Sequence, residues 1–121
     1  MYGLIGEKIW IDDERPAPDG YRWCRTYDQA IATIEYFDGC ENGIDEICFD
    51  HDLSGEKTGY DIAKYIVEKH IAMGGYHVHS VNPVGRQNIR ALMTHYGYNY
   101  MTPQYIQERE KNYGYNSKID F

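Results

Sequence analysis

The sequence predicts an α/β fold in which a mostly parallel, doubly wound sheet is covered by helices on both faces. Short apolar runs, typical of buried strands, alternate along the chain with segments whose apolar residues recur at helical spacing. Helices between consecutive strands are the connections that parallel strands require. The length of 121 residues is enough for one such domain and too short for two.

The first two predicted strands are joined without a helix. Residues 8–11 form an apolar run that ends at Asp12 and Asp13, and residues 21–25 form a second, weaker strand. Residues 14–20 hold two prolines and a glycine, so we expect a loop there. The second strand could therefore run parallel to the first through an extended crossover, or antiparallel to it.

Three helices are predicted from the residues at their first positions. Thr and Asn are preferred N-cap residues, and an acidic or amide side chain three positions after Thr completes a capping box. Proline is favoured at the first helical position. The predicted starts are Thr26 with Gln29, Thr58 with Asp61, and Asn82 with Pro83. Apolar residues at helical spacing extend these helices to about Gly39, Gly74 and Gly97.

Three further strands are predicted, over residues 47–49, 76–81 and 98–101. A last helix is expected to begin at Thr102 and Pro103 and to reach about residue 112. The sequence therefore predicts one domain over residues 1–112, followed by a C-terminal tail at 113–121.

Composition limits the classes of partner. A formal net charge of −7 argues against binding a nucleic-acid polymer, which needs clustered Lys and Arg. We expect a cytoplasmic protein with reduced cysteines, because no apolar run could cross a membrane and the start lacks a signal-peptide pattern. Five of the thirteen tyrosines follow Gly97. They could form an interface between copies of the chain, giving a homo-oligomer, or pack their rings internally.

The acidic positions suggest a relative. Asp12 and Asp13 follow the first strand, Asp50 follows the third, Ser80 ends the fourth and Pro103 follows the fifth. This pattern resembles the receiver domain of two-component signalling, a flavodoxin-like fold. The resemblance implies a five-stranded sheet of order 2-1-3-4-5, here lacking the first crossover helix, and acidic positions that hold Mg²⁺. Receivers carry a lysine just before that proline, whereas this chain has Thr102.

A divergent group, the cyclic-phosphate-processing receiver domains, is more similar still. Its likeness to this chain lies in four blocks, each at a strand end or a helix start. The blocks are IDDERP at residues 11–16, DHDL at 50–53, TGYD at 58–61 and HSVNPVGR at 79–86. The resemblance implies that the chain acts on a small cyclic phosphate.

The predicted metal ligands are Asp12, Asp13 and Asp50. In a receiver-like sheet the ends of strands one, three and four are neighbours, so these carboxylates should converge on one edge. Crowded carboxylates repel one another and favour a cation. An oxygen-rich site favours Mg²⁺ or Mn²⁺. The competing interpretation is an acidic surface loop with no bound ion.

The remaining candidate residues would act on phosphate. His51, His79 and Asp52 are the predicted catalytic residues, because imidazole groups titrate near neutral pH and can move protons. His77 shares a strand face with His79, and we prefer His79 because it lies nearer the carboxyl end. The predicted phosphate-binding residues are Arg15, Ser80, Asn82, Gly85 and Arg86. A helix start offers backbone N–H groups, and arginine can bind an oxyanion in a bidentate manner.

These residues support two main hypotheses. The first is a metal-dependent phosphoesterase that cleaves a small cyclic phosphate, such as a cyclic nucleotide signal. The second is a module that binds a phosphorylated ligand without cleaving it, with aromatic rings stacking on a base. A third, an ordinary receiver phosphorylated at Asp50, is the weakest because the lysine is replaced by Thr102.

Overall fold

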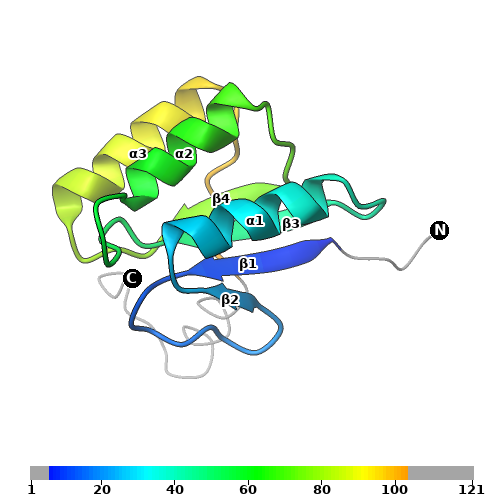
Figure 1. The fold of residues 1–121 in the computed structure, drawn as a ribbon. Coiled ribbons are helices and arrows are strands. Elements are labelled where there is room, and N and C mark those ends of the chain that lie inside the picture. Colours follow the sequence, from blue (N-terminus) through cyan, green and yellow to red (C-terminus); the bar gives the residue numbers. More distant parts are fainter. Residues whose placement is uncertain (1–5, 104–121) are drawn as a thin grey trace, which may run out of the picture.

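The computed structural model describes residues 6–103 of the chain. A parallel sheet of four strands, in the order β2-β1-β3-β4, forms its centre. The strands are β1 (Glu7–Ile11), β2 (Arg22–Cys24), β3 (Ile44–Phe49) and β4 (Gly75–Val78). In Figure 1 their carboxyl ends lie on one side of the molecule, together with the amino ends of the helices. The α/β class and the predicted order of the first four strands are confirmed.

Strand β2 is parallel to β1, which resolves the orientation that the sequence left open. Ile9 pairs with Arg22 and Ile11 pairs with Cys24. The chain connects the two strands through residues 12–21 without forming a helix. The missing first crossover helix is therefore confirmed, and an extended segment containing prolines takes its place.

Three helices complete the described part of the chain: α1 (Tyr27–Asp38), α2 (Gly59–Glu68) and α3 (Pro83–His95). All three predicted N-caps are confirmed, and Thr58 forms the full capping box with Asp61. The box predicted at Thr26 is only half formed. Its hydroxyl accepts from the Gln29 N–H, but the Gln29 side chain accepts from the N–H of Arg25, one residue before the cap.

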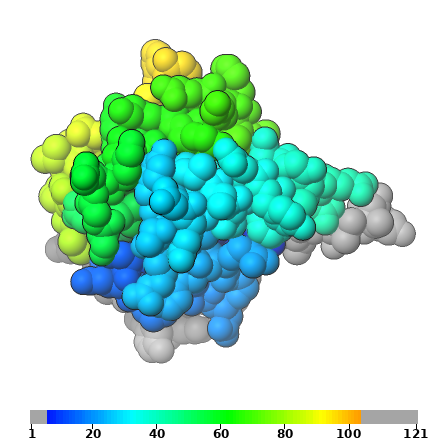
Figure 2. Space-filling model, viewed as in Figure 1, coloured from blue at the N-terminus to red at the C-terminus, as the bar shows by residue number. Residues whose placement is uncertain are grey.

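The three helices cover one face of the sheet (Figure 1). Helix α1 connects β2 to β3 and α2 connects β3 to β4, so both connections cross the sheet in the same direction. Right-handed crossovers in the same direction place their helices on the same face of the sheet. Figure 2 shows α1, in cyan, packed directly against α2, in green. The core lies beneath them and is built from one side of the strands and the inner faces of the helices, including Ile9, Ile11, Ile34, Ile47, Phe49, Ile62, Ile66, Val78 and Ile89.

The opposite face of the sheet carries more polar side chains. Trp10 pairs in register with Trp23 and Cys48, and Cys48 pairs with His77. Trp10, Cys48 and His77 are all buried. The prediction that helices cover both faces is not met within residues 6–103, where helices cover only the core face.

The predicted fifth strand is reduced to a single bridge. Tyr100 bridges Tyr76 in parallel, and Tyr76 exchanges backbone hydrogen bonds with Asn99 and Met101. The segment thus lies beside β4, where a fifth strand was expected, but no ladder forms. A turn at Gly97, with φ of 91°, limits the segment at one end. Pro103, which has no N–H to donate, limits it at the other.

Some predictions fall on residues that the structure does not describe. The last helix, expected to reach residue 112, lies outside the described residues beyond Pro103, as does the tail at 113–121. The same holds for three of the five tyrosines after Gly97. Between residues 6 and 103, no helix is both long enough and apolar enough to cross a membrane.

Candidate functional site

The three predicted metal ligands converge at the carboxyl edge of the sheet. Asp12 and Asp13 follow β1 directly, and Asp50 follows β3. One oxygen from each carboxylate lies within 4.8 Å of the others, and within residues 6–103 this is the one such group of acidic, His or Cys side chains. The adjacent, parallel pairing of β1 and β3 brings them together. We call Asp12, Asp13 and Asp50 the acidic cluster.

Asp12 is the buried member of the acidic cluster. Its Oδ1 accepts from the N–H groups of Glu14 and Arg15, both at 2.8 Å, and its Oδ2 lies 2.9 Å from Nε2 of His79. Burial by itself would raise the pKa of this carboxyl. The hydrogen bonds from His79 and the two backbone N–H groups outweigh burial and lower the pKa. Asp12 therefore stays ionised and is fixed in place.

The pKa of Asp50 shifts in the opposite direction from that of Asp12. Burial raises its pKa, and the negative charge of Asp12 raises it further, against the lowering effect of a hydrogen bond with Ser80. The ionised form of Asp50 is thus disfavoured in the folded protein. A bound cation would relieve this penalty, because it would compensate the charges of both carboxylates.

Replacing Asp50 with Asn is expected to separate metal binding from stability. The change is nearly isosteric and removes a charge whose formation the fold disfavours, so the melting temperature in EDTA should hold or rise. Affinity for Mn²⁺ should fall at least about tenfold, because an oxygen ligand of the cluster is neutralised. Calorimetry in EDTA and a Mn²⁺ titration would measure the two effects. A marked drop in the melting temperature would instead make Asp50 a structural partner within its loop.

Asp13 is half-buried and connects the acidic cluster to its surroundings. Its Oδ2 accepts from the Ser54 hydroxyl at 2.8 Å, and its carbonyl accepts from Nη2 of Arg25 at 3.0 Å. The carbonyl of Asp12 accepts from Nε1 of Trp23 at 2.8 Å. Sequence reasoning missed these three neighbours. A signal for Trp23 and Arg25 was available, since a β2 parallel to β1 puts its end beside Asp12 and Asp13.

His79 contacts the acidic cluster, whereas His77 does not. His79 is 0% exposed, and its ring stacks on Trp10 with the centroids 3.9 Å apart. Its Nε2 must donate to Asp12, because an ionised carboxylate only accepts. Its Nδ1 is buried without a hydrogen-bond partner in the described structure. His77 instead bonds the carbonyl of Met101 at 2.8 Å. The structure thus brings His79, of the two, to the site.

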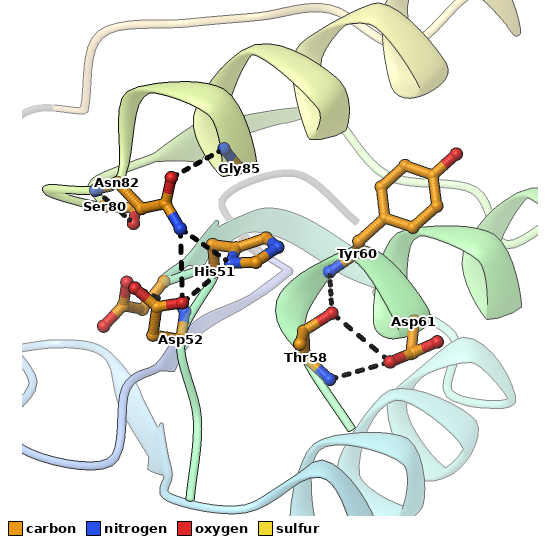
Figure 3. Close-up of polar contacts among 9 residues, drawn as sticks. His51, Asp52, Thr58, Tyr60, Asp61, Ser80, Asn82 and Gly85 are labelled. Atoms are coloured by element: carbon orange, nitrogen blue, oxygen red, sulfur yellow. Dashed lines mark hydrogen bonds and ion pairs between the residues drawn. The ribbon is translucent and has the colours of Figure 1, made fainter. Parts of the chain in front are cut away.

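His51 packs under the first turn of α3 (Figure 3). A Cβ on Gly85 would come 2.3 Å from Cγ of His51, so the ring occupies the space that glycine leaves open. Its Nδ1 lies 2.9 Å from Oδ1 of Asp52, and Asn82 Nδ2 approaches the same two atoms at 3.5 and 3.4 Å. His51, Asp52 and Asn82 therefore form one polar group beside the acidic cluster.

Several predicted phosphate-binding groups already have partners within the protein. The Gly85 N–H donates to Oδ1 of Asn82 at 3.0 Å, and the Ser80 hydroxyl accepts from the Asn82 N–H. Gly85 was expected to permit close approach of phosphate. In the structure it permits close approach of the His51 ring, and its N–H is used by the helix cap.

The two predicted phosphate-binding arginines donate to the chain after β4. Nη1 of Arg15 donates to the carbonyl of His79 at 3.1 Å, and Nη1 of Arg86 donates to the carbonyl of Ser80 at 2.8 Å. Both acceptor residues are buried. Each arginine thus helps to hold the end of β4 against its neighbours, and this structural contact was not anticipated.

Comparison with known proteins agrees with this geometry. Residues 7–95 match the family model described as the cyclic-phosphate processing receiver domain. The match includes all four strands, all three helices and every candidate site residue. No curated protein and no solved structure is significantly similar to the chain. The chain therefore belongs to the family of cyclic-phosphate processing receiver domains.

Proposed function

We propose that the chain is a metal-dependent phosphoesterase that acts on a small cyclic phosphate, such as a cyclic nucleotide signal. The observation that carries the proposal is the acidic cluster, with its three carboxylates within 4.8 Å and His79 bonded to Asp12. Membership of a family described as cyclic-phosphate processing supports a cyclic phosphate as the substrate class. The net charge of −7 makes a small ligand more suitable than a nucleic-acid polymer.

The donor set of the acidic cluster fits a divalent cation, Mg²⁺ or Mn²⁺. Three carboxylates offer the hard oxygen ligands that both ions prefer. The raised pKa of Asp50 also fits, because uncompensated charge at this edge is unfavourable. A bound cation would polarise a phosphoryl oxygen and lower the pKa of a bound water.

The histidines and the helix start would supply the remaining chemistry. His51, paired with Asp52, is the candidate for moving a proton at the ester, since it is partly exposed whereas His79 is not. In this proposal His79 holds Asp12 through the Nε2 bond, as an outer partner of a metal ligand does. Asn82 would orient His51 and Asp52, and Ser80 and Arg86 would lie at the phosphate.

Incubation with a panel of cyclic nucleotides is the direct test. With Mg²⁺ or Mn²⁺ present, chromatography should show at least one member converted to its ring-opened phosphate, and EDTA should stop the conversion. The Asp50→Asn variant is the matched control, because it should remain folded and lose turnover. Absence of conversion for every member, with metal binding shown by titration, would contradict the proposal.

A second candidate function is binding without cleavage. His79 has no exposed surface, and the ring of His51, although partly exposed, is packed against Gly85, which limits how far either ring can move toward a ligand. If neither can transfer a proton, the same edge would capture a phosphorylated ligand and retain it. Intact ligand recovered after denaturation would support this function, and quantitative conversion would exclude it.

A further inference from the structure

Two side chains at the end of β2 contact the backbone of the acidic cluster. Nε1 of Trp23 donates to the carbonyl of Asp12 at 2.8 Å, and Nη2 of Arg25 donates to the carbonyl of Asp13 at 3.0 Å. The Arg25 guanidinium also lies over the Trp23 ring, 4.8 Å from its centroid. Arg25 is therefore bonded to the backbone of a residue of the acidic cluster, and it follows β2, which lies at the edge of the sheet beside β1.

The charge of Arg25 has no carboxylate partner in the described structure. Within residues 6–103 its guanidinium forms one hydrogen bond, to a carbonyl, and its contact with Trp23 is with the ring. Arg22, two residues earlier, gives the contrast, because its Nε forms an ion pair with Glu7 at 2.8 Å. A guanidinium has five N–H donors, so Arg25 retains donors for an oxyanion while keeping the bond to Asp13.

The other two arginines near the site are less available than Arg25 to bind an oxyanion. Arg15 and Arg86 donate to carbonyls of His79 and Ser80, which are buried. Withdrawing those donors would leave buried acceptors unsatisfied, which is costly. The bond from Arg25 lies at the exposed surface, where water can replace it. Arg25 can therefore turn toward a ligand at lower cost than either of them.

We infer that Arg25, supported by the Trp23 ring, binds a phosphate group of the ligand at the acidic cluster. The inference rests on the proposed function. Three ionised carboxylates and one divalent cation still carry net negative charge, so an oxyanion arriving there needs a further cation. An exposed guanidinium without a carboxylate partner, next to Asp13, supplies it in a geometry suited to phosphate.

Arg25 could instead act only as a positioning residue, holding the Asp13 backbone so that the carboxylate stays in the cluster. The two roles differ in their effect on the metal. A positioning role predicts that losing Arg25 weakens metal binding. A phosphate-binding role predicts that metal binding is unchanged or slightly tighter, because a positive charge near the cation has been removed.

The test compares Arg25→Ala with Arg22→Ala in two titrations. In the first, Mg²⁺ is added to each protein and followed by calorimetry. In the second, inorganic phosphate is added at saturating Mg²⁺ and followed by ³¹P NMR, which detects millimolar binding. We expect Arg25→Ala to weaken phosphate binding by about tenfold or more, the scale of a charge-assisted hydrogen bond, with Mg²⁺ affinity within about twofold of wild type. Arg22→Ala should match wild type in both titrations, because its charge is already paired with Glu7.

Each other result has a definite meaning. Equal phosphate affinity for Arg25→Ala and wild type would overturn the inference and leave the proposed function standing. Loss of Mg²⁺ affinity together with phosphate affinity would also overturn it and make Arg25 a positioning residue. An equal loss of phosphate affinity for Arg22→Ala would overturn the inference, because the effect would then come from the net charge of the protein and not from the position of Arg25. Failure of the wild type itself to bind phosphate with Mg²⁺ bound would also overturn the inference, because Arg25 would then have no phosphate site to complete. The proposed function would still be decided by turnover of the cyclic nucleotides.

Discussion

The Gly59→Ala variant is expected to lose about 3 kcal/mol of its free energy of unfolding, the upper range for inserting a methyl group into a closely packed site. A Cβ at this position would lie 2.1 Å from the carbonyl oxygen of Asp50 and 3.1 Å from its carbonyl carbon. These are backbone atoms, so no side-chain rotation can make room. The Gly59 N–H also donates to the carbonyl of His51 at 2.8 Å, which holds the two segments together.

The same substitution is expected to disrupt the site. The clash can be relieved only by moving the start of α2 away from residues 50 and 51, and those residues carry one carboxylate of the acidic cluster and the His51 ring. Mn²⁺ affinity should therefore fall along with stability. Chemical denaturation in EDTA would measure the first effect, and calorimetric titration the second.

Gly39→Ala is the matched control for this prediction. Gly39 is the C-cap of α1 with an ordinary φ of −84°, and the nearest atom to an added Cβ is 3.6 Å away. The change should be neutral or slightly stabilising, because alanine restricts the unfolded chain more than glycine does. If Gly59→Ala lost no more stability than Gly39→Ala, the start of α2 could not lie as close to the Asp50 backbone as the structure shows.

The convergence of the acidic residues could be predicted from sequence because it depends on topology alone. Each carboxylate directly follows an apolar strand, and the carboxyl ends of neighbouring parallel strands share one edge of a sheet. The N-cap residues of the helices could be predicted for a similar reason. The bond from Thr58 to its own helix is local, so residue type and spacing are sufficient to predict it.

Features set by long-range contacts could not be predicted. Gly85 was assigned to phosphate from its place at a helix start, yet its lack of a Cβ accommodates His51, which is distant in sequence. Arg86 was identified as a phosphate ligand, but the buried carbonyl of Ser80 that it contacts is set by how β4 ends. The prediction of a full fifth strand over residues 98–101 is not met, for a different reason. A strand needs a partner over several residues, and within residues 6–103 Tyr100 is the one residue of the predicted strand that bridges to β4.

The Asp12→Ala variant is expected to be destabilised by about 3 kcal/mol or more, the usual cost of removing one partner from a buried pair. His79 would lose the carboxylate at its Nε2 while remaining buried against Trp10. The N–H groups of Glu14 and Arg15 would lose their acceptor as well, which loosens the turn that follows β1. Urea denaturation in EDTA measures this effect without a contribution from bound metal.

Asp13→Ala is the matched control for Asp12→Ala, since it makes the same change one residue later. Within residues 6–103 the Asp13 carboxylate has one hydrogen-bond partner, the exposed Ser54 hydroxyl, so its loss should cost less than about 1 kcal/mol. Both variants should lose Mn²⁺ affinity, because both remove a ligand of the acidic cluster. Equal stability losses for the two would contradict the buried pairing of Asp12 with His79.

The pH dependence gives an independent check on Asp12. The folded-state pKa of Asp12 lies below the ordinary aspartate value of 3.8, so its carboxylate stabilises the protein fully above the unfolded pKa. That stabilisation is lost as the pH falls below 3.8 and through the lowered folded-state value. The free energy of unfolding of the wild type should therefore fall more steeply in this acid range than that of Asp12→Ala. Asp50, whose pKa is raised, contributes with the opposite sign, so Asp50→Asn should leave the steep acid limb in place. Parallel acid limbs for wild type and Asp12→Ala would show that the Asp12 carboxylate does not stabilise the folded state.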